Sequence, residues 1–208
     1  MKRAIILSIL LFVVCDPAGA ALVTIAIEGV VDYVDDPYGL LPAEITPGDA
    51  ITGIYTYDTA TADSNPFSMY GSYRHVAPYG IFLTVGDLSF ESSAPATDFL
   101  VGIGNDYPPN DDYYLLSYNN YSLSNGTPVD YISWQLDDPT GTALSSTDLT
   151  GDAPILSNWQ SNILSITADR MYAIKGHVES VTIVPEPATP ALLAIGALAM
   201  GRKRHRCR

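Results

Sequence analysis

Side chains of alternating polarity mark the first of a series of short β-strands in the middle of the chain. Val23, Ile25 and Ile27 alternate with the more polar Thr24 and Glu28. A period of two places the apolar side chains on one face of a strand, as a half-buried sheet requires. Nine further segments have strand-like alternation or composition: Ile51–Asp58, Met69–Val76, Gly80–Val85, Leu88–Ser92, Phe99–Asn105, Tyr113–Tyr121, Tyr131–Asp137, Ile163–Ala168 and Tyr172–Val184.

Clusters of Gly, Pro, Asp and Asn separate these segments, for example at Asn125–Pro128 and Asp138–Gly141. Such residues favour tight turns, and no stretch shows a sustained helical period of 3.6 residues. One helical turn is expected, at Ile155–Gln160. About ten short strands at near-regular spacing predict a single all-β domain over residues 21–184, built as an antiparallel β-sandwich or jelly roll.

The N-terminal segment has the organisation of a secretory signal peptide. A basic start precedes the apolar run Ala4–Val14, and Ala18 and Ala20 supply the small side chains that signal peptidase accepts. Residues 1–20 are therefore predicted to be a signal helix that is removed on export, with the export machinery and signal peptidase as partners. A buried N-terminal helix is the alternative, but it does not explain why these features occur together.

Both cysteines, Cys15 and Cys207, lie in the end segments. The central domain can therefore hold neither an internal disulfide nor a thiolate metal site, and it must be stable through its core and its hydrogen bonds. Cys15 could carry a lipid, but Val14 is bulkier than the residue expected before a lipidated cysteine.

Three features follow one another after the last predicted strand. Pro185, Glu186 and Pro187 form a segment that can continue neither a helix nor a strand ladder. The apolar run Thr189–Gly201 would be about 20 Å long as a helix, which is short for a hydrocarbon core of about 30 Å. A basic stop-transfer cluster follows, formed by Arg202, Lys203, Arg204, Arg206 and Arg208. A short transmembrane helix that anchors the chain temporarily in the inner membrane is expected.

This order of a Pro-Glu-Pro motif, a short apolar helix and a basic cluster, over residues 185–208, resembles the PEP-CTERM protein-sorting signal. Bacteria with this signal have an exosortase, a membrane-embedded enzyme with a catalytic cysteine. The resemblance implies that the exosortase recognises the Pro-Glu-Pro motif, that the tail is removed, and that the protein reaches the cell surface or the exopolysaccharide matrix. An ordinary tail anchor is the alternative, and it does not explain the short span.

Four central segments resemble the ectodomains that commonly precede this sorting tail: Glu28–Val31, Ile51–Asp58, Leu136–Ser146 and Ile174–Val181. Those ectodomains mostly have no assigned function. The resemblance supports the fold and implies no mechanism.

The central domain is strongly acidic. Between Ala21 and Val184, three basic residues stand against 21 acidic ones, a net charge of −18. Such a field repels phosphate backbones, so nucleic-acid binding is excluded.

The sequence contains no pattern of catalytic residues. It has no G-x-S-x-G motif, and His75 and His177, which lack metal-binding spacing, are expected to be surface or hydrogen-bonded strand residues. The adjacent carboxylates Asp111-Asp112 and Asp137-Asp138 are expected to point apart as solvated turn residues, and not to form the acid–base pair of a hydrolase. The protein is therefore not expected to be an enzyme.

Calcium is the one metal for which the domain has candidate ligands. Hard oxygen ligands gather in a turn-rich segment, at Asn105, Asp106, Asn110, Asp111 and Asp112. This segment matches neither the EF-hand loop nor the Gly-rich calcium repeat in full, and a solvated loop is the favoured interpretation. No cofactor is expected, with calcium as the alternative.

Tyrosines suggest a second kind of site. Tyr113, Tyr114, Tyr118 and Tyr121 form the densest group, with Trp134 nearby in sequence. Alternation places Tyr114 and Tyr118 on one face and Tyr113 and Tyr121 on the other, so half of these tyrosines are expected in the core. Exposed aromatic rings offer sugars an apolar surface. The main hypothesis is a non-catalytic structural or adhesive surface unit, and the alternative is a carbohydrate-binding module of the exopolysaccharide matrix.

Overall fold

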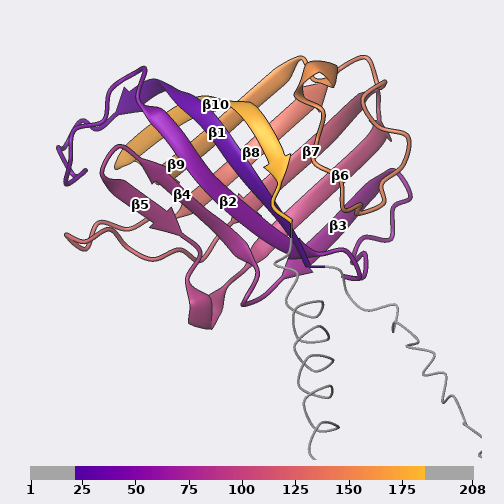
Figure 1. Ribbon diagram of the computed structural model, residues 1–208, viewed down its shortest axis with the longest axis horizontal. Coiled ribbons are helices and arrows are strands. Elements are labelled where there is room, and N and C mark those ends of the chain that lie inside the picture. Colours follow the sequence, from indigo (N-terminus) through magenta and orange to yellow (C-terminus); the bar gives the residue numbers. More distant parts are fainter. Residues whose placement is uncertain (1–21, 186–208) are drawn as a thin grey trace, which may run out of the picture.

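The computed structural model describes residues 22–185, which form ten strands in one antiparallel sheet (Figure 1). In chain order the strands are β1 (Leu22–Asp35), β2 (Ala50–Asp58), β3 (Tyr70–His75), β4 (Gly80–Val85), β5 (Leu88–Glu91), β6 (Phe99–Tyr107), β7 (Asn110–Ser117), β8 (Tyr131–Asp138), β9 (Ser161–Ala168) and β10 (Tyr172–Ile183). Their order in the sheet is β3-β6-β7-β8-β9-β10-β1-β2-β4-β5. The predicted all-β, antiparallel class is confirmed.

All ten predicted strands are present, although some of their ends differ from the prediction. The largest shift is in β7, which begins at Asn110 and ends at Ser117, whereas the sequence predicts Tyr113–Tyr121. The helical turn predicted at Ile155–Gln160 is a 3₁₀ turn, η2 (Leu156–Asn158). A second 3₁₀ turn, η1 (Ala94–Ala96), was not predicted.

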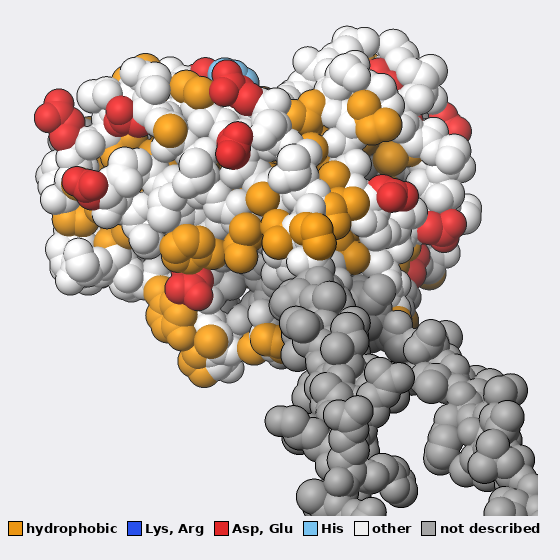
Figure 2. Space-filling view, in the orientation of Figure 1, with side chains coloured by type: hydrophobic (Ala, Val, Ile, Leu, Met, Phe, Trp, Pro, Cys, Tyr) orange, Lys and Arg blue, Asp and Glu red, His pale blue; other side chains and the backbone are white. Residues whose placement is uncertain are grey.

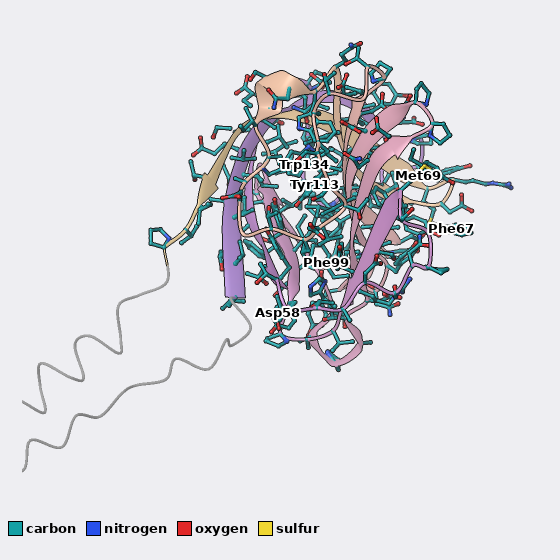
Figure 3. All side chains as sticks on the ribbon, turned by 90° about the vertical axis from the view of Figure 1, so that its right-hand side faces the viewer. Asp58, Phe67, Met69, Phe99, Tyr113 and Trp134 are labelled. Atoms are coloured by element: carbon teal, nitrogen blue, oxygen red, sulfur yellow. The ribbon has the colours of Figure 1, made fainter. Side chains whose placement is uncertain are left out.

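The sheet folds back on itself, so that strands far apart in its order face each other. The hydroxyl oxygen of Tyr55 on β2 lies 3.2 Å from that of Tyr113 on β7, and the ring centroids of Tyr55 and Trp134 on β8 are 6.1 Å apart. Figure 3 shows Tyr113, Trp134 and Phe99 between the two layers. The predicted sandwich therefore has its two layers, but one continuous sheet supplies both.

Two glycines allow the long strands β1 and β10 to approach closely. A Cβ atom on Gly29 would lie 2.2 Å from the carbonyl oxygen of His177, and one on Gly176 would lie 2.3 Å from that of Val30. No larger residue fits at either position without a shift of the backbone. The same β1–β10 ladder has two register shifts, and such bulges bend a strand and increase its twist. We infer that this ladder helps one sheet to supply both layers.

Both ends of the described chain lie at the same edge of the domain, because β1 and β10 are antiparallel neighbours (Figure 1). Ile183 pairs with Ile25, and the amide of Val184 donates to the carbonyl oxygen of Thr24 at 2.8 Å. The predicted signal helix, the apolar run and the basic cluster fall outside the described residues. Within residues 22–185, no helix has the length and apolar character needed to cross a membrane.

Candidate functional site

Five tyrosines gather on the outer face of the layer formed by β3, β6, β7 and β8, and we call them the tyrosine strip: Tyr70, Tyr107, Tyr114, Tyr118 and Tyr131. Four of them belong to these strands, and Tyr118 is the residue that follows β7. Tyr107, Tyr118 and Tyr131 expose 51%, 37% and 44% of their surfaces. The register pairs Tyr70 with Gly104 and Tyr114 with Gly102, so the strands bring together residues that are distant in sequence.

Glycines of β6 make room for the strip. A Cβ atom on Gly102 would lie 2.3 Å from the hydroxyl oxygen of Tyr70 and 3.2 Å from a ring carbon of Tyr114. A Cβ atom on Gly104 would lie 3.3 Å from the Tyr70 ring. The side chain of Tyr70 therefore lies across the bare backbone of β6, beside Tyr114.

Contacts continue along the strip in both directions. The ring centroids of Tyr70 and Tyr107 are 5.8 Å apart, as are those of Tyr118 and Tyr131. Tyr114 lies between these two pairs: burial, followed by the neighbouring side chains of Tyr118 and Tyr70, raises its pKa to about 12. At neutral pH the Tyr114 hydroxyl is therefore protonated and can donate a hydrogen bond.

Arg74 is the only Lys or Arg residue on β3, β6, β7 and β8. Its guanidinium carbon lies 5.8 Å from the centroid of the Tyr118 ring, and its Nη1 atom forms an ion pair with Asp98. The cation–π contact holds the guanidinium over the Tyr118 ring. The ion pair offsets the one positive charge on this face.

Two carboxylates lie next to the aromatic rings. Asp112 on β7 is the cross-strand partner of Asp137 on β8, and Asn110 Nδ2 donates to Asp137 Oδ1 at 3.0 Å. Burial raises the pKa of Asp112, and repulsion by Asp137 raises it further. Asp112 also contributes to the raised pKa of Tyr70, after the larger effect of burial. Like charges directly opposite each other destabilise a sheet, so this face carries an uncompensated acidic pair.

The structure separates the predicted aromatic residues as alternation requires, with one exception. Tyr113 is 7% exposed and Trp134 is fully buried, whereas Tyr114 and Tyr118 lie on the outer face. Alternation puts Tyr121 on the same face as Tyr113, but Tyr121 lies outside the core because β7 ends at Ser117. Tyr121 is 45% exposed, and its hydroxyl oxygen accepts a hydrogen bond from the amide of Ala94 at 3.2 Å.

Three members of the strip, Tyr70, Tyr107 and Tyr131, are not among the residues that the sequence indicates as a site. A usable signal is present in the sequence of β6, where Gly102 and Gly104 alternate with the large apolar residues Val101 and Ile103. Glycine at alternate positions in a strand often marks the close approach of another group. The cross-strand register determines which group approaches, and this register cannot be predicted from the pattern of a single strand.

The predicted calcium ligands lie in or next to the β6–β7 hairpin, and Asp111 has a structural role there. Asp111 is fully buried, and its two oxygens accept hydrogen bonds from the amides of Asp106 at 2.9 Å and Leu144 at 2.7 Å. Asn105 Nδ2 donates to Asp106 Oδ2 at 3.4 Å. Asp112 lies on the outer face, opposite Asp137. Residues 22–185 contain no group of three or more His, Cys, Asp or Glu residues that could hold a metal ion.

Asp138, the cross-strand partner of Asp111, organises the start of the loop that follows β8. Its carboxylate accepts hydrogen bonds from the amides of Thr140, Thr142 and Ala143 and from both threonine hydroxyls. These bonds, the Thr140 hydroxyl first, hold the pKa of Asp138 well below its ordinary value. The prediction that the paired carboxylates are solvated is therefore wrong for Asp111 and Asp138, which face inward and bind backbone amides.

We expect calcium to leave the stability of the domain unchanged, because both Asp111 oxygens are already engaged by amides. The check is the melting temperature of the protein in millimolar calcium and in excess chelator. A ligand that binds only the folded state must raise the melting temperature. A clear rise with calcium would contradict the expectation and restore the calcium interpretation of the hairpin.

The two histidines of the domain have different environments. His177 lies at the surface, with its Nδ1 atom 2.9 Å from Asp32. His75 is 2% exposed, its Nε2 atom is 3.4 Å from the carbonyl oxygen of Asp58, and its Nδ1 atom has no hydrogen-bond partner within the described chain. The expectation of a hydrogen-bonded strand residue therefore holds for Nε2 of His75 but not for its Nδ1. Burial lowers its pKa, and the nearby carbonyl groups oppose that shift.

We expect His75 to make the domain less stable as the pH falls below about 6.5, the ordinary pKa of histidine in the unfolded chain. Since the folded-state pKa of His75 is lowered, the unfolded chain binds the proton more readily than the folded chain does. The stabilising contribution of neutral His75 is therefore fully present only above the unfolded-state pKa. The urea concentration at the unfolding midpoint should decrease as the pH is lowered from neutral to mildly acidic. His75→Phe should lose much of this fall and His177→Gln should keep it; equal pH dependence in all three proteins would contradict the assignment.

A pocket of about 220 Å³ lies under the loop between β8 and β9. Tyr113 and Trp159 line it together with apolar side chains, and Asp148 and Asp152 contribute the only charged groups. It is smaller than the range of about 300–1,000 Å³ that is usual for ligand sites. The open tyrosine strip therefore offers a polymer more contact surface than this pocket does.

Comparison with known proteins identifies the end of the chain. The family model of the PEP-CTERM protein-sorting motif matches residues 184–205. The match begins at the residue that follows β10, so the motif starts where the folded domain ends. No curated protein and no solved structure matches the chain.

Proposed function

From the PEP-CTERM sorting motif, we propose that the β-domain is displayed at the cell surface or in the exopolysaccharide matrix as a non-catalytic adhesive or structural unit. The motif itself implies an exported protein that an exosortase sorts toward the surface. In the proposed route, signal peptidase removes residues 1–20 and the tail holds the chain temporarily in the inner membrane. The exosortase then acts at Pro185-Glu186-Pro187, which directly follow the domain.

The observation that carries this proposal is the position of the sorting motif next to the first strand. Val184 is hydrogen-bonded to Thr24, so the segments before and after the domain join it at the same edge. A domain held there keeps its remaining surface available to the medium. This arrangement suits a displayed unit.

The sheet edges favour an adhesive unit over a fibre built by strand pairing. On the edge strand β3, the amide of Ser72 donates to Asp63 Oδ1 and its carbonyl oxygen accepts from the amide of Ser64. At the other edge, the carbonyl oxygen of Glu91 accepts from the amide of Tyr121. Loops thus occupy edge groups that another chain would need for pairing.

Cell fractionation tests the proposal. Antibodies against the β-domain should detect a form at the cell surface or in the matrix that lacks both residues 1–20 and the C-terminal tail. Mass spectrometry of this form would locate both cleavage points. A mature protein found only in the cytoplasm, or only in the inner membrane with its tail intact, would contradict the proposed display.

A second candidate function, carbohydrate binding within the matrix, is favoured by the tyrosine strip. Three of its five rings are more than one third exposed, although Tyr70 and Tyr114 are more covered. An aromatic surface of this kind is not needed to stabilise the core.

A further inference from the structure

We propose that the tyrosine strip binds internal segments of a neutral polysaccharide chain. This inference rests on the proposed adhesive role and names the ligand class for it. Three features of the strip support it: the extent of the aromatic surface, the hydrogen-bonding groups beside it, and the sign of its charge.

The strip is long and open. On one face of a strand, residues two apart are separated by about 6.7 Å, so the outer face from Asp112 to Tyr118 spans about 20 Å. Tyr107 extends the aromatic surface beyond Asp112 through its contact with Tyr70. This length exceeds that of a single sugar ring. An open surface also admits a chain from either side, which favours internal segments over chain ends.

The edges of the strip carry groups suited to sugar hydroxyls. Asp112 and Asp137 offer carboxylate oxygens, and Gln135, the cross-strand partner of Tyr114, offers an amide. The carboxylates of Asp112 and Asp137 lie opposite each other and repel, although Asn110 donates to Asp137. Hydroxyl groups that donate to both carboxylates would relieve part of this cost. A phenol group can both donate and accept a hydrogen bond, so the strip can pair with sugar hydroxyls of either role.

Charge selects among polysaccharides. Arg74 is the only cation on these strands and is paired with Asp98, so the acidic pair is not neutralised. The opposite layer is acidic as well: Figure 2 shows Asp and Glu side chains scattered over that face and no Lys or Arg. Between residues 21 and 184 the acidic residues outnumber the basic ones by 21 to 3, and the other two basic side chains, Arg170 and Lys175, line a pocket beside Tyr131 together with Asp35 and Asp169. The net field of the domain therefore opposes an anionic polysaccharide. A neutral chain avoids this repulsion.

The test uses the full chain in a polyoxyethylene detergent, which contains no sugar. Affinity electrophoresis and calorimetry with galactomannan, xyloglucan and dextran as neutral probes should show binding to at least one of them, and alginate should not bind. The double variant Tyr118→Ala/Tyr131→Ala should raise the Kd for the bound polymer about tenfold or more. The matched control Tyr33→Ala/Tyr38→Ala removes two exposed tyrosines outside the strip and should leave the Kd unchanged.

Asp112→Ala separates a binding role from a structural one. This variant removes the repulsion with Asp137, so its melting temperature should be equal to or above that of the parent, while its affinity for the polymer falls. The proposal is overturned if no neutral probe binds, if alginate binds as well, or if the strip variant binds like the parent. Binding only to a cationic probe such as polylysine would also overturn it and would assign the face to a basic protein.

Measuring the location of the protein distinguishes a failure of the ligand assignment from a failure of the proposed function. The Tyr118→Ala/Tyr131→Ala protein should be exported and processed like the parent, because its tail is intact. If the parent binds a neutral polymer but is never displayed, the adhesive role fails and the ligand assignment stands. If it is displayed but binds none of the neutral probes, the ligand assignment fails alone.

Discussion

Replacing Trp134 by alanine is expected to destabilise the domain by about 3–5 kcal/mol, which is a large part of the roughly 5–15 kcal/mol that stabilises a typical domain. Trp134 is fully buried between the layers, with ring centroids 6.1 Å from Tyr55 and 5.9 Å from Tyr113. Its Nε1 atom donates to Asn162 Oδ1 at 2.9 Å. The substitution leaves a cavity at the point where the layers meet and removes this bond.

Urea denaturation of the fragment 21–184, which contains the whole described core, is the measurement for this prediction. Tyr131→Ala is the matched control, because Tyr131 is an aromatic residue on the same strand that is 44% exposed. It should cost no more than about 1 kcal/mol. Similar losses in the two variants would show that the layers are not held together around Trp134.

The strands could be predicted from the sequence because burial on one face imposes a period of two on each strand separately. The pairing of strands could not be predicted in the same way. Tyr70 and Tyr114 are 44 positions apart and meet only because β6 lies between their strands and has glycine at positions 102 and 104. The tyrosine strip is thus a product of register, whereas the face of Tyr114 and Tyr118 within their own segment was predictable.

The carboxylates and His75 show a second limit. Alternation within β7 and β8 would have turned Asp111 and Asp138 inward, but a charged residue is expected to be solvated unless its partners are known. Those partners are backbone amides of the following loops, such as Leu144, and their positions depend on the folded chain. Three of the four ectodomain-like segments contain residues with such structural roles. Gly29 and Gly176 allow β1 and β10 to approach closely, and Asp138 organises the loop that follows β8.

Replacing Pro185, Glu186 and Pro187 together by alanine is expected to abolish processing of the tail. The PEP-CTERM match covers these residues, and the prolines, which lack a backbone N–H, keep the segment from continuing the ladder of β10. Alanine is the best helix former, so the apolar run that follows could extend through the altered segment. The variant should stay in the inner membrane with its tail uncut, while the parent loses its tail and reaches the surface.

Immunoblots of membrane, surface and medium fractions measure this outcome, and two further variants locate its cause. Pro42→Ala/Glu44→Ala removes a proline and a glutamate from an exposed loop and should be processed like the parent. Deleting residues 202–208 should instead weaken retention in the membrane during export, because the basic stop-transfer signal is lost. If the triple-alanine protein is cleaved and released like the parent, recognition does not depend on Pro-Glu-Pro and an ordinary tail anchor explains this end of the chain.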